Sequence, residues 1–109
     1  MARTFVNIAI QQNQALTDEV VRRVLIADNY REINYNTEVV WKKGTGLMTA
    51  MQFIKLEYNG GVLCVSGWIQ IGVGSVGGRE HDLTGITGIV AKKSVLKTIE
   101  RIKAAVSAI

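Results

Sequence analysis

The side chains best suited to chemistry gather around the single histidine of this chain. His81 lies between Glu80 and Asp82, and a histidine oriented by a carboxylate can act as a general base near neutral pH. Side chains of adjacent residues do not normally converge on one point, and no pattern positions the nearby hydroxyls of Ser75 and Thr84. We therefore interpret this segment as an exposed polar loop and assign no catalytic residue. An enzyme that uses His81 ranks third among the candidate functions.

A glycine-rich motif and a lone cysteine give weak signals as well. Residues 72–77 match the G-x-G-x-x-G spacing of dinucleotide-binding loops. Such a loop must open a helix within a β–α–β unit, and no helix is predicted after Gly77, so we interpret 72–88 as a strand end and a loop. Cys64 is predicted to be a partly buried strand residue opposite Lys55. One cysteine and one histidine supply too few ligands for the common metal sites, so we expect neither a metal nor a cofactor.

Apolar periodicity predicts the N-terminal elements that must position these residues. Residues 4–11 alternate in character and predict a strand with one mostly apolar face. A helix is expected to follow from an N-cap at Thr17 and to end near Asp28 and Asn29. Within this helix, Arg22 is predicted to point away from the buried apolar stripe.

The central part of the sequence predicts paired strands. Residues 33–41 carry apolar side chains at odd positions, which indicates one long strand or two short ones with a break near Asn36. The next two apolar runs are joined by the pair Asn59-Gly60, and Asn-Gly is the preferred pair for a two-residue type I′ turn. This turn would place Leu56 opposite Leu63 and make one face of the hairpin wholly apolar. We expect that face to form the core.

The opposite face of the same hairpin is also apolar, which is unusual. The predicted pairing brings Met51, Phe53 and Trp68 together there, although a two-layer sheet normally presents polar residues on its outer face. An apolar patch in that position indicates a partner, a ligand or a covering segment. The sequence leaves open whether a partner or ligand covers this patch or whether residues 72–88 fold over it. With Trp41, these three residues are the candidate binding residues.

The last helix, expected from about Ala91 to the end of the sequence, carries the excess positive charge. Residues 1–90 contain equal numbers of basic and acidic side chains, so the formal net charge of +4 arises from the final segment. Lys93, Lys97 and Arg101 form a stripe at four-residue spacing that could contact phosphates or an anionic membrane surface. The simpler interpretation is the solvated face of an amphipathic helix, which disfavours nucleic acid and membranes as partners.

The order of elements predicts the fold class. A single domain over residues 1–109 is expected, with α+β class and the order β-α-β-β-β-(β)-α. The simplest arrangement is a two-layer sandwich with a mainly antiparallel sheet and both helices on one face. No apolar run approaches the ~20 residues of a membrane-spanning helix, and the first residues lack the apolar core of a secretory signal. Together with the lone cysteine, this predicts a cytoplasmic protein.

Several motifs share the layout of a known group of proteins. W-K-K-G-T-G at 41–46, Y-N-G-G at 58–61 and D-L-T-G at 82–85, followed by a lysine-rich last helix, resemble short bacterial proteins of uncharacterised activity. The resemblance covers roughly residues 38–105. It implies an acidic residue after the glycine-rich loop, which Glu80 matches, and it implies no activity, cofactor or catalytic residue.

These observations rank the candidate functions. The first is a small, non-catalytic binding or interaction module that uses Trp41, Met51, Phe53 and Trp68, with a second copy of the chain or a small apolar ligand as its partner. The alternative is binding of an anionic polymer or a membrane surface through Lys93, Lys97 and Arg101. The salt dependence of binding separates the two, because phosphate contacts weaken steeply as salt rises.

Overall fold

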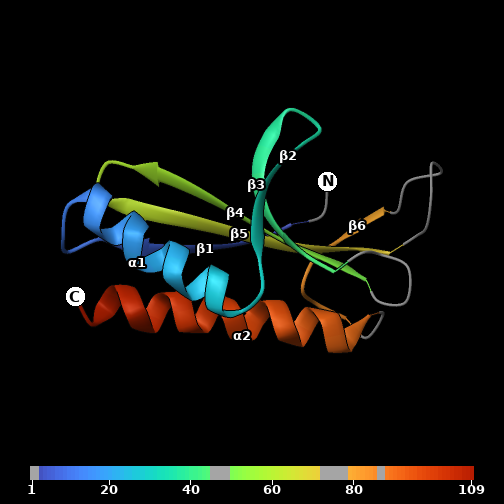
Figure 1. Ribbon diagram of the computed structural model, residues 1–109. Helices are drawn as coiled ribbons and strands as arrows, with labels where there is room; N and C mark the ends of the chain where they lie inside the picture. Colours follow the sequence, from blue (N-terminus) through green and yellow to red (C-terminus); the bar gives the residue numbers. More distant parts are fainter. Residues whose placement is uncertain (1–2, 45–49, 72–78, 86–87) are drawn as a thin grey trace.

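Two helices and six strands make up the part of the chain that the structure describes (Figure 1). The structure is a computed structural model, and it describes residues 3–44, 50–71, 79–85 and 88–109. The elements are, in order, β1 (Thr4–Ala9), α1 (Gln14–Ala27), β2 (Arg31–Tyr35), β3 (Glu38–Lys43), β4 (Met51–Asn59), β5 (Val62–Ile71), β6 (Arg79–His81) and α2 (Ile89–Ser107).

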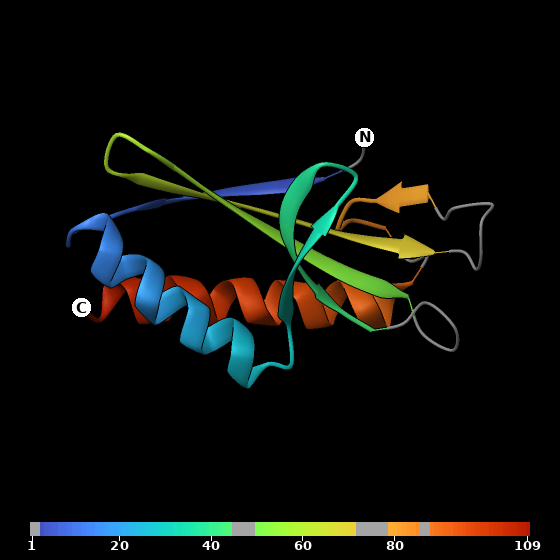
Figure 2. The same ribbon diagram turned by 45° about the horizontal axis from the view of Figure 1, so that its top comes forward.

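The strands form one antiparallel sheet, and both helices lie on the same side of it. The strand order is β1-β5-β4-β3-β2, and the short β6 pairs with β5 beyond the end of β1. Figures 1 and 2 show α1 and α2 side by side beneath the sheet, on the side away from the tip of the β2–β3 hairpin. The α+β fold expected from the sequence is therefore confirmed.

The main core lies between the sheet and the two helices. From α2, the buried side chains of Val95, Ile99, Ile102 and Val106 face the sheet, as the helical spacing predicts. The helix crosses β5 at Gly67, where a Cβ would lie 2.9 Å from Ile99 Cδ1, 3.0 Å from Val95 Cγ1 and 3.1 Å from Leu83 Cδ1. A larger residue at Gly67 would therefore push α2 away from the sheet.

The first helix begins one turn earlier than the sequence predicts. Asn13 is the N-cap of α1, and its side-chain oxygen accepts a hydrogen bond of 2.8 Å from the backbone N–H of Leu16. Thr17, the expected cap, is buried inside the helix, and its hydroxyl donates to the carbonyl of Asn13 over 2.9 Å. Asn ranks above Thr as an N-cap residue, so the prediction placed the start of the helix at the weaker of two available caps. The predicted end is confirmed, because Asp28 caps the helix and Asn29 has a φ of 68°.

The expected break near Asn36 is confirmed as a tight turn between β2 and β3. Asn36 and Thr37 both have positive φ, at 51° and 67°. β3 then pairs with β4 only through Trp41–Lys43. The rest of the hairpin bends away from β4 on the side opposite the helices (Figure 1).

The turn between β4 and β5 differs by one residue from the prediction. Gly60 and Gly61 form the two-residue loop, with φ of 52° and 84°, while Asn59 is the last residue of β4 and pairs with Val62. Leu56 consequently lies opposite Val65 rather than Leu63. Glycine adopts positive φ more easily than asparagine, because it lacks a Cβ. The register moves by two residues, so every side chain keeps the face that the sequence assigned to it.

A second apolar cluster fills the outer face of the sheet, opposite the helices. Phe53 and Trp68 are neighbours across β4 and β5, and their rings stack with centroids 5.3 Å apart. Tyr35 from the bent hairpin packs on Phe53 at 5.2 Å, and its hydroxyl accepts a hydrogen bond from Gln70. With Val40 buried beside them, these contacts show that the β2–β3 hairpin folds over the outer face.

Arg3 closes the other side of this cluster. Its guanidinium lies over the Trp68 ring, 3.7 Å from the centroid. It donates two hydrogen bonds to Glu38 of β3 (3.0 and 2.8 Å) and two to Glu80 of β6 (both 3.1 Å). Lys55 of β4 also contacts Glu38, at 2.9 Å. Because only 7% of the Arg3 side chain is exposed, these pairs are shielded better than ordinary surface ion pairs.

Substitutions in the β4–β5 turn should distinguish the two registers. Gly61→Val should lower the free energy of unfolding by about 1–2 kcal/mol or more, because a β-branched residue resists positive φ. Asn59→Val should change it by less than about 0.5 kcal/mol, because Asn59 occupies a strand position. Urea denaturation of both variants measures the difference. A larger loss of stability for Asn59→Val than for Gly61→Val would show that Asn59 and Gly60 form the loop.

Acid should weaken the fold through Glu38. Hydrogen bonds from Arg3 and then Lys55 lower the pKa of this carboxyl from 4.5 to about 2. Because the folded pKa is below the unfolded one, the contribution of Glu38 to stability is complete above about pH 4.5 and is lost as the pH falls towards 2. We expect Glu38→Gln to lower the free energy of unfolding by about 1–2 kcal/mol at neutral pH.

Urea denaturation at a series of pH values measures this contribution. The difference between the wild type and Glu38→Gln should shrink to nearly zero by about pH 2. Glu57→Gln serves as the control, because the Glu57 carboxylate only approaches Lys55 at 4.0 Å. A difference for Glu38→Gln that stays constant down to pH 2 would contradict the assigned role of Glu38.

Candidate binding site

The four predicted binding residues do not share one surface. Phe53 and Trp68 are 0% and 1% exposed under the β2–β3 hairpin and Arg3, and Met51 packs beside them, half-buried. Trp41 lies on the opposite side of the sheet, because it pairs with Ile54 of the helix-facing core. Little of the predicted outer patch is thus accessible in this structure. The segment 72–88 was one of the covers that the sequence left open, and its residues 72–78 and 86–87 lie outside the described residues.

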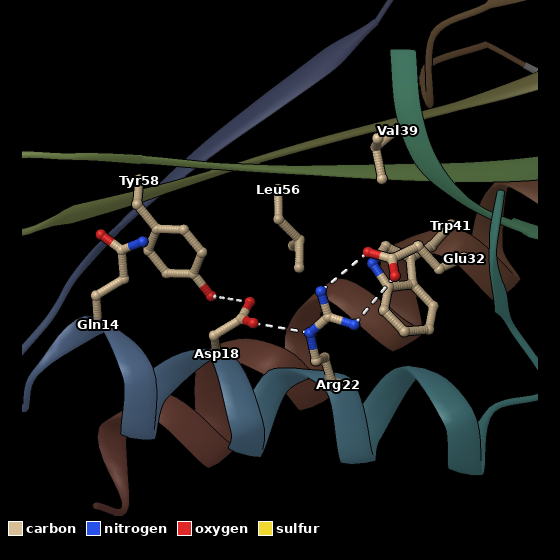
Figure 3. A pocket seen from close by; sticks show the side chains of 8 residues that line it. All are labelled: Gln14, Asp18, Arg22, Glu32, Val39, Trp41, Leu56 and Tyr58. Atoms are coloured by element: carbon tan, nitrogen blue, oxygen red, sulfur yellow. Dashed lines mark hydrogen bonds and ion pairs between the residues drawn. The ribbon is translucent and has the colours of Figure 1, made fainter. Parts of the chain in front are cut away.

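An accessible pocket opens on the helix side, next to Trp41. It has a volume of about 260 Å³ and lies between α1 and strands β2 to β4 (Figure 3). We call it the α1–sheet pocket. Its lining residues are Gln14, Asp18, Arg22, Glu32, Val39, Trp41, Leu56 and Tyr58. The three residues from α1 are four positions apart, so they share one face of the helix.

A continuous polar chain runs along the floor of the α1–sheet pocket (Figure 3). The Tyr58 hydroxyl donates to Asp18 Oδ1 over 2.8 Å, and Arg22 Nε donates to Asp18 Oδ2 over 2.7 Å. The other guanidinium nitrogens of Arg22 donate to Glu32 at 2.9 and 3.2 Å. Each group therefore fixes the next, which orders the pocket before any ligand arrives.

Tyr58 and Arg22, the hydrogen-bond donors of this polar chain, both stay protonated. Burial, and then the bond to Asp18, raise the pKa of Tyr58 well above its ordinary value. The hydrogen bonds to Glu32 and then to Asp18 raise the pKa of Arg22 further above its already high value. Two carboxylates face one guanidinium, so the α1–sheet pocket carries a net charge of about −1 at neutral pH.

The opposite wall of the pocket is apolar and partly open to water. Val39 is 57% exposed, and Leu56 extends from β4 toward the polar chain (Figure 3). The guanidinium carbon of Arg22 lies 5.4 Å from the centroid of the Trp41 ring. The pocket thus combines an apolar wall with a larger set of fixed polar groups.

A second pocket gathers part of the predicted basic stripe. It has a volume of about 240 Å³ and lies where the end of α1 meets α2. Lys97 and Arg101 line it, together with Lys43 from β3, whereas Lys93 is exposed outside it. We call it the basic pocket. Its lining residues are Ala27, Asp28, Asn29, Lys43, Ser94, Lys97, Thr98 and Arg101.

Asp28 organises the basic pocket. Its carboxylate pairs with Arg101 and accepts a hydrogen bond of 2.6 Å from the Thr98 hydroxyl. Lys43 donates to the Ser94 hydroxyl over 3.2 Å, and its ammonium lies 4.9 Å from the centroid of the Tyr30 ring. These cations surround the C-terminal end of α1, where positive charge also stabilises the helix dipole.

The residues around His81 point to different partners. Glu80 is bound to Arg3, and Asp82 accepts hydrogen bonds from the backbone N–H and the hydroxyl of Thr84. In the described chain, neither carboxylate is hydrogen-bonded to His81. Ser75 and the glycine motif at 72–77 lie outside the residues that the structure describes.

Cys64 is not activated by its surroundings. It lies opposite Glu57 rather than the expected Lys55. Burial, followed by the charge of Glu57, raises the pKa of its thiol, which lowers the thiolate fraction and the reactivity. Within the described ranges, no cluster of three or more His, Cys, Asp or Glu side chains could hold a metal ion. None of the described helices is long and apolar enough to cross a membrane.

Sequence reasoning missed the polar chain of the α1–sheet pocket. Arg22 was expected to point away from the core, and it does remain 42% exposed. Its two acidic partners, Asp18 and Glu32, come from different elements, α1 and β2. The spacing of Asp18 and Arg22 by four positions was the one available signal. The contributions of Glu32 and Tyr58 depend on how the strands pass α1.

Comparison with family models, with curated proteins and with solved structures returned no match for this chain.

Proposed function

We propose that this protein is a small, non-catalytic binding module and that the α1–sheet pocket is its ligand site. The observation that carries the proposal is the combination of the open apolar wall at Val39 and Leu56 with the ordered polar chain from Tyr58 to Glu32. Ordered groups lose little conformational entropy when a ligand binds. A cytoplasmic location, expected from the sequence, remains part of the proposal.

The chemistry of the pocket favours a ligand with a cationic head and an apolar body. The net negative charge attracts a cation, and the carboxylates of Asp18 and Glu32 have free lone pairs. The ring of Tyr58 can add a favourable interaction with positive charge, whereas the buried Trp41 ring already contacts Arg22. The volume of about 260 Å³ lies just below the usual range for drug-sized ligands. It therefore suits a small amine or one basic side chain of a peptide.

Binding without catalysis agrees with the protonation states in the pocket. The raised pKa of Tyr58 keeps its hydroxyl protonated, so the hydroxyl orients Asp18 and does not act as a base. Arg22 remains charged and bound to both carboxylates. Tyr58 and Arg22 can therefore donate hydrogen bonds to a ligand, and neither acts as a general base.

The basic pocket supports a second candidate, the binding of an anion. The specific observation is that Lys43 joins Lys97 and Arg101 around one hollow, although it is far from them in sequence. A phosphate of a nucleic acid or a lipid headgroup would meet three cations there. Asp28 and the end of α1 already compensate part of this charge, so this candidate ranks second.

Titration of the ¹⁵N-labelled protein with two matched probes tests both proposals. Phenethylammonium should shift the amide signals of α1, β3 and β4 around the α1–sheet pocket, and phenylacetate should bind there more weakly. Glu32→Gln should weaken phenethylammonium binding by about two- to fivefold, the value of a partly exposed charge pair. Glu57→Gln, an exposed glutamate on the outer face of β4, should leave binding unchanged.

Each result decides between the candidates. Saturable shifts confined to the α1–sheet pocket, weakened by Glu32→Gln alone, support the first. Phenylacetate shifts around Lys97 and Arg101 that disappear at high salt support the second. If neither probe shifts either pocket, the small-ligand proposal is wrong.

A further inference from the structure

We propose that β1 pairs with β1 of a second copy of this chain, so that the sheets of two molecules join into one. The inference rests on the free edge of β1 and does not depend on the ligand proposed for the α1–sheet pocket. Among the described strands, β1 has a neighbour, β5, on one side only. The other side carries the backbone groups that form the next ladder of a sheet.

The register identifies which backbone groups are free. The N–H of Ile10 donates to the carbonyl of Gly61 at 2.9 Å. Because the backbone groups of successive strand residues point to opposite sides, the even residues of β1 bond to β5. Phe5, Asn7 and Ala9 therefore direct their N–H and C=O groups to the outside. Within the described residues these groups have no backbone partner.

The composition of β1 does not protect this edge. Its sequence, TFVNIA, contains neither a charged residue nor a proline, and such residues are the usual means by which an edge strand resists pairing. The other edge of the sheet, β2, begins with Arg31 and Glu32. The β2 edge therefore carries charge along its strand, whereas β1 carries none and the charged β6 (Arg79–His81) lies only beyond its end. Phe5, which is 63% exposed, adds an apolar side chain beside the open edge.

β1 is complementary to itself, which favours a second copy over an unrelated strand. An antiparallel pair centred on Asn7 places the Asn7 residues of the two copies opposite each other. The same register places Phe5 of one copy opposite Ala9 of the other, a large residue against a small one. All six facing residues are those with free backbone groups, so the symmetric pair satisfies them together.

The size of this contact predicts a weak association. Six residues per strand bury less than the ~1,200 Å² of a standard interface. The expected behaviour is a reversible equilibrium in which the dimer forms as the concentration rises. Both helix layers then lie on the same side of the joined sheet, because the symmetry axis runs perpendicular to it.

Proline substitution on the two edges provides a matched test. Asn7→Pro removes an outward N–H and keeps the bonds of β1 to β5, since proline is tolerated on an edge where its nitrogen faces solvent. Asn34→Pro makes the same change on the free edge of β2, where the even residues point outward. Sedimentation over a concentration series should show a wild-type dimer, an unchanged dimer for Asn34→Pro and a monomer for Asn7→Pro.

A second variant and a second readout keep the test decisive if Asn7→Pro unfolds. Phe5→Lys changes only an exposed side chain and should raise the dimer dissociation constant by about tenfold or more. Hydrogen exchange at the amides of Phe5, Asn7 and Ala9 should be slow in concentrated wild-type protein and fast on dilution. A wild type that is monomeric at every concentration would overturn the proposal. A dimer that neither β1 variant weakens would overturn it as well.

Discussion

The guanidinium of Arg3 holds together segments that the chain order keeps far apart. It bonds to Glu38 and Glu80 and lies on the face of Trp68, so the N-terminal segment, β3, β5 and β6 meet at one side chain. A guanidinium suits this position because its planar fork can serve two carboxylates while its face stacks on an aromatic ring. The removal of any one partner would leave a shielded charge with fewer contacts.

The outer face of the sheet needs a cover because the helices form a layer on the other face only. Two helices can cover only one face of the sheet, yet β4 and β5 are apolar on both. The β2–β3 hairpin bends over the second face and covers it, with Tyr35 on Phe53 and Arg3 over Trp68. The same bend exposes the helix side of β3 next to α1, where Val39 and Trp41 line the α1–sheet pocket. Covering one face thus opens the hollow on the other.

The sequence predicted the elements better than it predicted their contacts. The alternation of apolar side chains predicted the face of the hairpin on which Phe53 and Trp68 lie. This prediction is correct although the turn lies one residue later than expected. Alternation says nothing about what lies above a face, so Tyr35 and Arg3 could not be foreseen as its cover. The α1–sheet pocket was missed for the same reason, because Asp18, Glu32 and Tyr58 belong to three elements. The predicted turn was wrong by one residue, because the prediction placed Asn59 in the loop where the structure has Gly61. Both residues can adopt positive φ, and glycine does so more easily.

The position of β1 in the sheet has a consequence for synthesis of the chain. β1 ends at Ala9, but β5, its one neighbour among the described strands, begins at Val62. On the ribosome the first strand is complete while its partner has yet to be translated, and both of its edges stay unpaired until β5 emerges. Contacts between such distant segments form slowly, because a long loop must close first. β1 is therefore open to incorrect pairing during translation for longer than β2, β3 or β4, each of which pairs with the strand that follows it in sequence.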